Sequence, residues 1–169
     1  FACANGKQQI VAYAEDGTSE VFAANVSSND LVQGPHGMYV TDPTNRRVLL
    51  INGHGKVSIV DQGIAFPNGI ALSPDETQLF VANSDEDEKI WMVYDLDENG
   101  ASNGRVFYDV NDQTDAGAAD GMKVDLAGNL FATGPGGVWV LGWDGVHLGT
   151  IMPGEVVANV AWAEDGQTL

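Results

Sequence analysis

The sequence predicts an all-β fold of the propeller type. Short strand-like segments alternate along the whole chain with turns rich in Gly, Asn and Asp. No segment has the 3.6-residue apolar period that a helix longer than one turn requires. One unit of two short strands recurs at intervals of about 40 to 50 residues, which is typical of propeller blades. We therefore expect one partial β-propeller domain over residues 1–169, forming an incomplete arc of roughly four blades.

The clearest copy of this unit lies within residues 66–87. The letters PNG at 67–69 precede an apolar run at 70–72, and SPDE at 73–76 then predicts a tight turn. Proline presets φ in such a turn, and an aspartate side chain can bond its own backbone there. A second strand is expected directly after the turn.

The other copies begin at Asn29, Asp120 and Asn159. With Asn68, these positions lie 39, 52 and 39 residues apart, and we expect a blade to begin near each of them. An Asn or Asp thus recurs at one structural position. The remaining strands are expected at 8–14 and 19–23 in the first blade, 31–32, 38–41, 46–52 and 56–60 in the second, 90–96 and 105–110 in the third, and 138–141 and 147–151 in the fourth.

Both ends of the chain lie inside predicted blades. Phe1 falls within a strand, and Leu169 precedes a strand that the repeat would supply. A propeller avoids exposed strand edges by closing its circle. We therefore expect a piece of a longer protein, with the missing blades supplied by the rest of that chain or by another chain.

The charge balance limits the partners. Seven basic residues face 24 acidic ones, which gives a net charge of −17. This sign repels nucleic acid and anionic membranes, so we expect neither as a partner. It suits a cation, although an acidic surface also simply aids solubility. No apolar run reaches the roughly 18 residues of a membrane span. We expect a soluble protein, and the single cysteine, Cys3, leaves open whether it is cytoplasmic, periplasmic or secreted.

Three ordered motifs occur along the chain: SNDLV at 28–32 with YVTDP at 39–43, FPNGIALSPD at 66–75, and ADGMKVD at 119–125 with GPGGVWV at 134–140. Together they resemble the senescence-marker-protein-30/gluconolactonase/luciferin-regenerating-enzyme (SGL) family. The resemblance covers nearly the whole chain. It implies a six-bladed propeller with a divalent cation, usually Ca²⁺, in its central channel. It also implies hydrolysis of sugar lactones such as gluconolactone, a small-molecule substrate.

The resemblance also implies roles for individual residues. Asn68 and Asp120 match metal ligands of the family, and Asn29 matches a third ligand that also binds substrate. Asp120 is the expected catalytic residue. The family's first-blade Glu ligand has no counterpart here. Ser27 stands where animal members have a substrate-binding Arg, which leaves the substrate preference open.

The residue types suit this chemistry. Calcium prefers hard oxygen ligands, which Asn carbonyls and an Asp carboxylate provide; Zn²⁺ or Mg²⁺ is the alternative cation. A bound cation can polarise a lactone carbonyl, and a nearby carboxylate can deprotonate the attacking water. Alone, an Asn or Asp before Gly is usually only a turn residue. Two other functions therefore stay open: a non-catalytic propeller that serves as a binding scaffold, and an organophosphate hydrolase on the same metal site.

Overall fold

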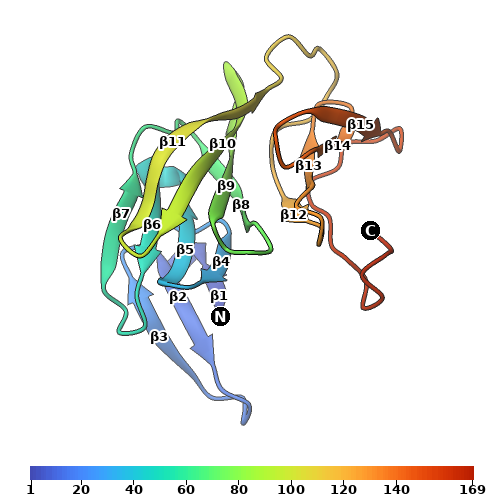
Figure 1. Cartoon of the computed structure of the whole chain (residues 1–169). Coiled ribbons are helices and arrows are strands. Elements are labelled where there is room, and N and C mark those ends of the chain that lie inside the picture. The colour runs from blue at the N-terminus through green and yellow to red at the C-terminus, as the bar shows by residue number, and fades with distance from the viewer.

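The computed structural model describes residues 1–169, and its regular secondary structure is almost wholly β-strand (Figure 1). Fifteen strands form four separate antiparallel sheets. The only helical segments are two 3₁₀ turns of three residues each, η1 (Asn5–Lys7) and η2 (Pro43–Asn45). Neither has the length or the apolar character that a membrane-crossing helix requires. The expected all-β fold is confirmed.

Each sheet is a meander, in which strands adjacent in sequence are hydrogen-bonded neighbours. This is the construction of a propeller blade, so the sheets are called blades 1 to 4 in chain order. Blade 1 contains β1 (Ala2–Ala4), β2 (Gln9–Tyr13) and β3 (Ser19–Ala24). Blade 2 contains β4 (Leu31–Gly34), β5 (Gly37–Asp42), β6 (Arg47–Ile51) and β7 (Val57–Asp61). Blade 3 contains β8 (Pro67–Leu72), β9 (Gln78–Asp85), β10 (Glu88–Asp97) and β11 (Gly100–Asp109). Blade 4 contains β12 (Met122–Val124), β13 (Leu130–Gly134), β14 (Gly137–Leu141) and β15 (His147–Ile151).

The core lies between blades. Three apolar clusters fill the three spaces between blades 1 and 2, blades 2 and 3, and blades 3 and 4. Strand β9 illustrates how, because successive side chains of a strand point to opposite faces. Leu79 and Val81 pack toward blade 2, whereas Phe80 and Ala82 pack toward blade 4. Each blade is thereby positioned by its neighbours, which fixes the relative placement of the blade starts.

Aromatic side chains fill the space between blades 3 and 4. Trp91 and Trp139 are both buried, with ring centroids 6.1 Å apart. On the opposite face of β13, away from blade 3, Phe131 meets Trp162 edge-on with centroids 4.9 Å apart. Trp143 differs, because it lies in the turn between β14 and β15 and is 69% exposed. Tryptophan therefore occupies both packing and surface positions in this chain.

Two segments depart from the strand pattern that the sequence suggests. Strand β11 begins at Gly100 rather than at 105, because Asp97 and Gly100 already pair and Gly100 has φ +107, which a tight turn needs. Residues 152–169 contain no strand. Asn159, where a further blade was expected to begin, lies in this segment. A strand requires a ladder of hydrogen bonds with a partner strand, and these residues form no such ladder.

Candidate functional site

Three blades begin with an Asn or Asp, and these residues differ in exposure: Asn68 is buried, Asp120 is half-buried and Asn29 is exposed. Asn68 lies inside β8, while Asn29 and Asp120 each lie two residues before the innermost strand of their blade. Asn29 and Asp120 nevertheless form backbone hydrogen bonds with the second strand of their blade. The Asn29 N–H donates to Thr41 O at 2.9 Å, and the Asp120 N–H donates to Thr133 O at 3.2 Å. All three residues therefore have a fixed backbone at the start of the inner strands.

Blades 3 and 4 make close backbone contact at this point. A Cβ at Gly69 would overlap the carbonyl oxygen of Asp120, so only glycine fits there. The register of β8 and β9 also shifts between Pro67 and Ile70, which is a bulge. Glycine and bulge together bring the chain at Asn68 against the chain at Asp120.

A second glycine permits a similar close approach at the start of blade 4. A Cβ at Gly121 would overlap the side chain of Asn159. The Gly121 N–H also donates to Ala158 O at 2.9 Å. Asn159 thus lies beside the start of blade 4, although no strand begins there.

A second carboxylate lies at the site, and reasoning from the sequence missed it. Asp30 Oδ1 accepts a hydrogen bond from the Leu31 N–H at 2.8 Å, and Asp30 Oδ2 accepts one from the Ile70 N–H at 3.4 Å. Asp30 therefore connects blade 2 to blade 3. A signal was present in the sequence: Asn68 and Asp120 are each followed by Gly, whereas Asn29 is followed by this Asp.

The two carboxylates affect each other electrostatically. Burial raises the pKa of Asp120, the negative charge of Asp30 raises it further, and the backbone bond at Gly121 opposes the rise. No basic side chain pairs with either group, because the ion pairs of the chain join Asp42 to Arg47 and Asp95 to Arg105. A partly buried pair of acidic groups without a basic partner favours a cation.

Asn68 is held at both its backbone and its side chain. Its carbonyl accepts a hydrogen bond from Thr41 Oγ1 at 2.6 Å. Its Nδ2 donates to Ser84 Oγ at 2.9 Å, and Ser84 Oγ donates in turn to Ala119 O. Asn68 Oδ1 is left without a hydrogen-bond donor in the protein, so it is available to a ligand.

The donor set limits which metal could bind. No three His, Cys, Asp or Glu side chains gather closely enough to hold an ion. A site at the blade starts would therefore combine the Asp120 carboxylate with the amide oxygens of Asn29 and Asn68. Such all-oxygen sets suit Ca²⁺ or Mg²⁺, whereas Zn²⁺ prefers nitrogen and sulfur.

A groove of about 440 Å³ runs along the inner strands from this point. Its walls come from β4, β8 and β12, and Asp30 is the residue that joins it to the blade starts. Lys123 lies in the wall, with Nζ bonded to Met122 O at 2.9 Å. The groove gives a small polar substrate room beside the candidate ligands.

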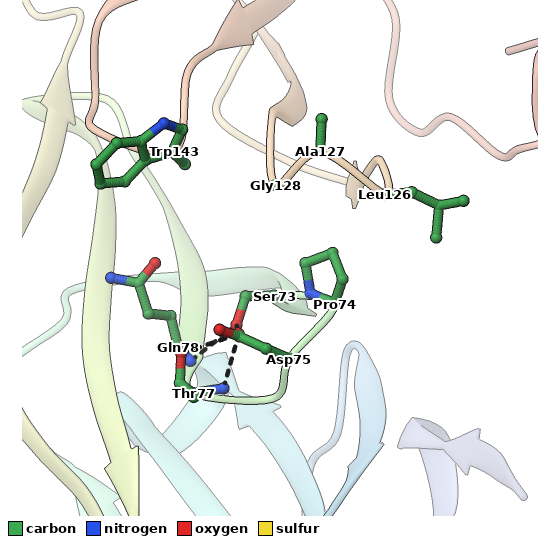
Figure 2. A pocket seen from close by; sticks show the side chains of 9 residues that line it. All are labelled: Ser73, Pro74, Asp75, Thr77, Gln78, Leu126, Ala127, Gly128 and Trp143. Atoms are coloured by element: carbon green, nitrogen blue, oxygen red, sulfur yellow. Dashed lines mark hydrogen bonds between the residues drawn. The ribbon is translucent and has the colours of Figure 1, made fainter.

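A second hollow, of about 500 Å³, lies at the other end of the inner strands (Figure 2). It separates the turn after β8 from the turn after β12, with Trp143 at its edge. Asp75 holds the first turn together by accepting bonds from Ser73 Oγ at 2.7 Å and Thr77 Oγ1 at 2.9 Å. Because Asn68 and Asp120 begin the strands that end here, this hollow is distinct from the candidate site.

The comparison with known proteins decides the family. The family model described as "SMP-30/Gluconolactonase/LRE-like region" matches residues 1–169. The chain belongs to this family. The resemblance of the three motifs is therefore confirmed over the full length of the chain.

Two curated proteins have related sequences. A gluconolactonase of Zymomonas mobilis is 40% identical over 164 residues, covering 89% of this chain and 46% of the relative. The pentonolactonase XacC of Haloferax volcanii is 28% identical over 142 residues, covering 79% of this chain and 48% of the relative. The chain thus spans about half the length of the curated relatives that it matches.

Solved structures share the fold. A gluconolactonase from Xanthomonas campestris superposes with a TM-score of 0.82 at 25% identity, covering 98% of this chain and 62% of that one. A calcium-binding regucalcin from Agrobacterium tumefaciens gives 0.71 at 21% identity, covering 90% of this chain and 57% of that one. The expected propeller-type architecture is confirmed.

Proposed function

We propose that the full-length protein is a divalent-cation-dependent hydrolase that opens sugar lactones such as gluconolactone, with calcium as the cation. One observation carries the proposal. The backbone at Gly69, directly after Asn68, lies against the backbone of Asp120, and Asp30 connects the start of blade 2 to the Ile70 N–H in blade 3. The 40% identity to a gluconolactonase supports the reaction class, and a calcium-binding neighbour in structure supports the cation.

Asn68, Asp120 and Asn29 would hold the cation. The oxygen donors fit a hard cation, and the unpaired charge of Asp120 and Asp30 supplies much of the attraction. When bound, the cation polarises the lactone carbonyl and stabilises negative charge on its oxygen. Asn29 would also contact the substrate, since it adjoins Asp30 in the wall of the groove.

Asp120 would act as the general base. Its carboxylate can accept a proton from the water that attacks the carbonyl carbon. In the cation-free chain, burial and the charge of Asp30 raise the pKa of Asp120. A bound cation would oppose this rise and keep the Asp120 carboxylate ionised. The proton can then pass to the ring oxygen that leaves when the lactone C–O bond breaks.

A substrate panel tests the proposal. Full-length protein would be assayed with gluconolactone, a fatty-acyl lactone and an organophosphate, each with calcium, zinc or EDTA. We expect calcium to support gluconolactone hydrolysis and EDTA to abolish it. Hydrolysis of the organophosphate alone would favour that alternative on the same site. The absence of all hydrolysis and of cation binding would favour the binding scaffold.

A further inference from the structure

We propose that Ser84 is a positioning residue that selects which end of the Asn68 amide faces the cation. The proposal rests on the function proposed above and adds to it a residue outside the ligand set. Ser84 lies near the end of β9, 16 residues from Asn68 and 35 from Ala119. It contacts the start of blade 3 through its own blade and the start of blade 4 across the blade boundary.

The hydrogen bonds that the Ser84 hydroxyl can form determine the orientation of the Asn68 side-chain amide. A serine hydroxyl carries a single hydrogen. Ser84 donates it to Ala119 O, which can only accept. Ser84 Oγ can therefore only accept from Asn68, and the group that faces it must be the amide nitrogen, at 2.9 Å. The Asn68 oxygen consequently points away from Ser84. A flipped amide would present its N–H groups to the cation instead.

The other blades show that Ser84 does more than link neighbours. Thr41 Oγ1 donates to Asn68 O at 2.6 Å, and Thr133 Oγ1 donates to Ala158 O at 3.3 Å. Each threonine thus bonds to the backbone where the next segment begins. The corresponding residue of blade 3 is Ala82, which has no hydroxyl, and Ser84 supplies the link from two positions later.

Because Ser84 lies two positions after Ala82, its hydroxyl also reaches the side chain of Asn68. A hydroxyl that only linked blades 3 and 4 would need no contact with the Asn68 side chain, and neither threonine touches the side chain of a candidate ligand. Ser84 bonds both to the Asn68 amide and to the carbonyl directly before Asp120. The bond to Ala119 O uses the hydroxyl hydrogen of Ser84, and this leaves the amide nitrogen of Asn68 as the group that faces Ser84 Oγ.

Calcium titration calorimetry on the full-length protein tests the proposal. We expect Ser84→Ala to weaken calcium affinity about 10- to 100-fold, the range found when a partner of a metal ligand is removed. Ser84→Thr keeps the hydroxyl and should retain most of the affinity. Thr133→Val removes a hydroxyl that bonds to the backbone at Gly121 O and Ala158 O and to no ligand side chain, so it should lower Tm without changing calcium affinity.

A double variant distinguishes an effect of Ser84 through Asn68 from a general disruption of the site. If Ser84 acts through Asn68, Ser84→Ala should cost no further calcium affinity once Asn68→Ala is present. An equal further loss in that background would overturn the proposal. Should Ser84→Ala not fold, Ser84→Cys, which weakens both bonds in a side chain of similar shape, takes its place with the same expected outcomes.

The remaining outcomes distinguish this inference from the proposed function. Wild-type affinity in Ser84→Ala, with calcium binding and lactone hydrolysis intact in the wild type, would overturn the role of Ser84 alone. Failure of the wild type to bind calcium would overturn the proposed function, and the role of Ser84 with it.

Discussion

At the scale of single residues, the site depends on how closely two blades approach. Gly69 has no room for a side chain, because a Cβ would overlap Asp120 O, a backbone atom that cannot rotate away. The absence of a side chain at this position therefore brings the start of β8 against Asp120, the residue proposed as the general base.

Gly69→Ala tests this contact. The added methyl group must push blades 3 and 4 apart, so we expect the free energy of unfolding to fall by about 1–3 kcal/mol, as for other overpacked positions. Calcium affinity should fall as well, because Asp120 moves away from Asn68. Urea unfolding and calcium titration of the full-length protein measure the two effects.

Gly149→Ala is the matched control. Gly149 lies in β15, and a Cβ there meets no atom within 4 Å. It should alter neither stability nor calcium affinity appreciably. If Gly69→Ala behaved like this control, the close approach of the blade starts would not matter to the site.

The candidate ligands could be proposed from sequence, whereas their supporting residues could not. Asn29, Asn68 and Asp120 recur at one position of a repeat, and a repeat is visible in a linear sequence. Asp30 and Ser84 act through contacts with blades that are distant in sequence, such as Asp30 with Ile70. Only the packing of one blade on another brings those groups together.

At the scale of elements, two tryptophans of blades 3 and 4 occupy the same apolar cluster but differ in polar bonding. The Trp139 Nε1–H donates to Pro135 O at 2.9 Å. The Trp91 Nε1–H is buried and has no hydrogen-bond partner. A buried donor without an acceptor is a cost that the packing of Trp91 must offset.

Replacement of each tryptophan by Phe separates these effects. Trp91→Phe and Trp139→Phe remove similar volumes from one cluster, but only the second breaks a hydrogen bond. We expect Trp139→Phe to cost about 1 kcal/mol more, because it leaves Pro135 O unpaired. Chemical unfolding of the two variants measures the difference. An equal or larger cost for Trp91→Phe would contradict this description of the cluster.

Element positions followed from sequence where turn residues and alternation agreed. The four strands of blade 2 lie close to the expected segments, because Gly, Pro and Asn mark each of its turns. The extension of β11 to Gly100 was not visible, since polar residues at 102–105 suggest a loop. Pairing with β10 overrides that local preference.

At the scale of the whole molecule, the acidic charge and the candidate cation site make a joint prediction. Calcium that binds only the folded protein stabilises it, by about 2.7 kcal/mol at a concentration 100 times Kd. We expect calcium to raise the Tm of the full-length protein and EDTA to reverse the rise. With a net charge of −17, any salt should also raise Tm by screening the repulsion among acidic side chains. Sodium chloride at equal ionic strength is therefore the control. A rise of the same size with sodium chloride would indicate screening rather than a site.

The repeat also made the overall architecture predictable. Blade order, the antiparallel meander and the absence of long helices all follow from a unit that recurs along the chain. The packing between blades did not follow, because alternation within a strand does not say which neighbour each face meets. Trp143 shows that residue type does not settle burial either. A tryptophan suggests a core position, but Trp143 lies in the turn between β14 and β15 and is exposed.

The most direct test of the central claim is gluconolactone hydrolysis by the full-length protein across a calcium titration, for wild type, Asn68→Ala and Asp120→Asn. Both variants should need more calcium. Asn68→Ala should recover most of the wild-type rate at saturation, because Asn68 transfers no proton. Asp120→Asn should stay at least about 10²-fold slower, since a general base contributes about that much or more. Full recovery of Asp120→Asn at saturating calcium would contradict its role as the base. An unchanged calcium dependence in both variants would contradict the placement of the site.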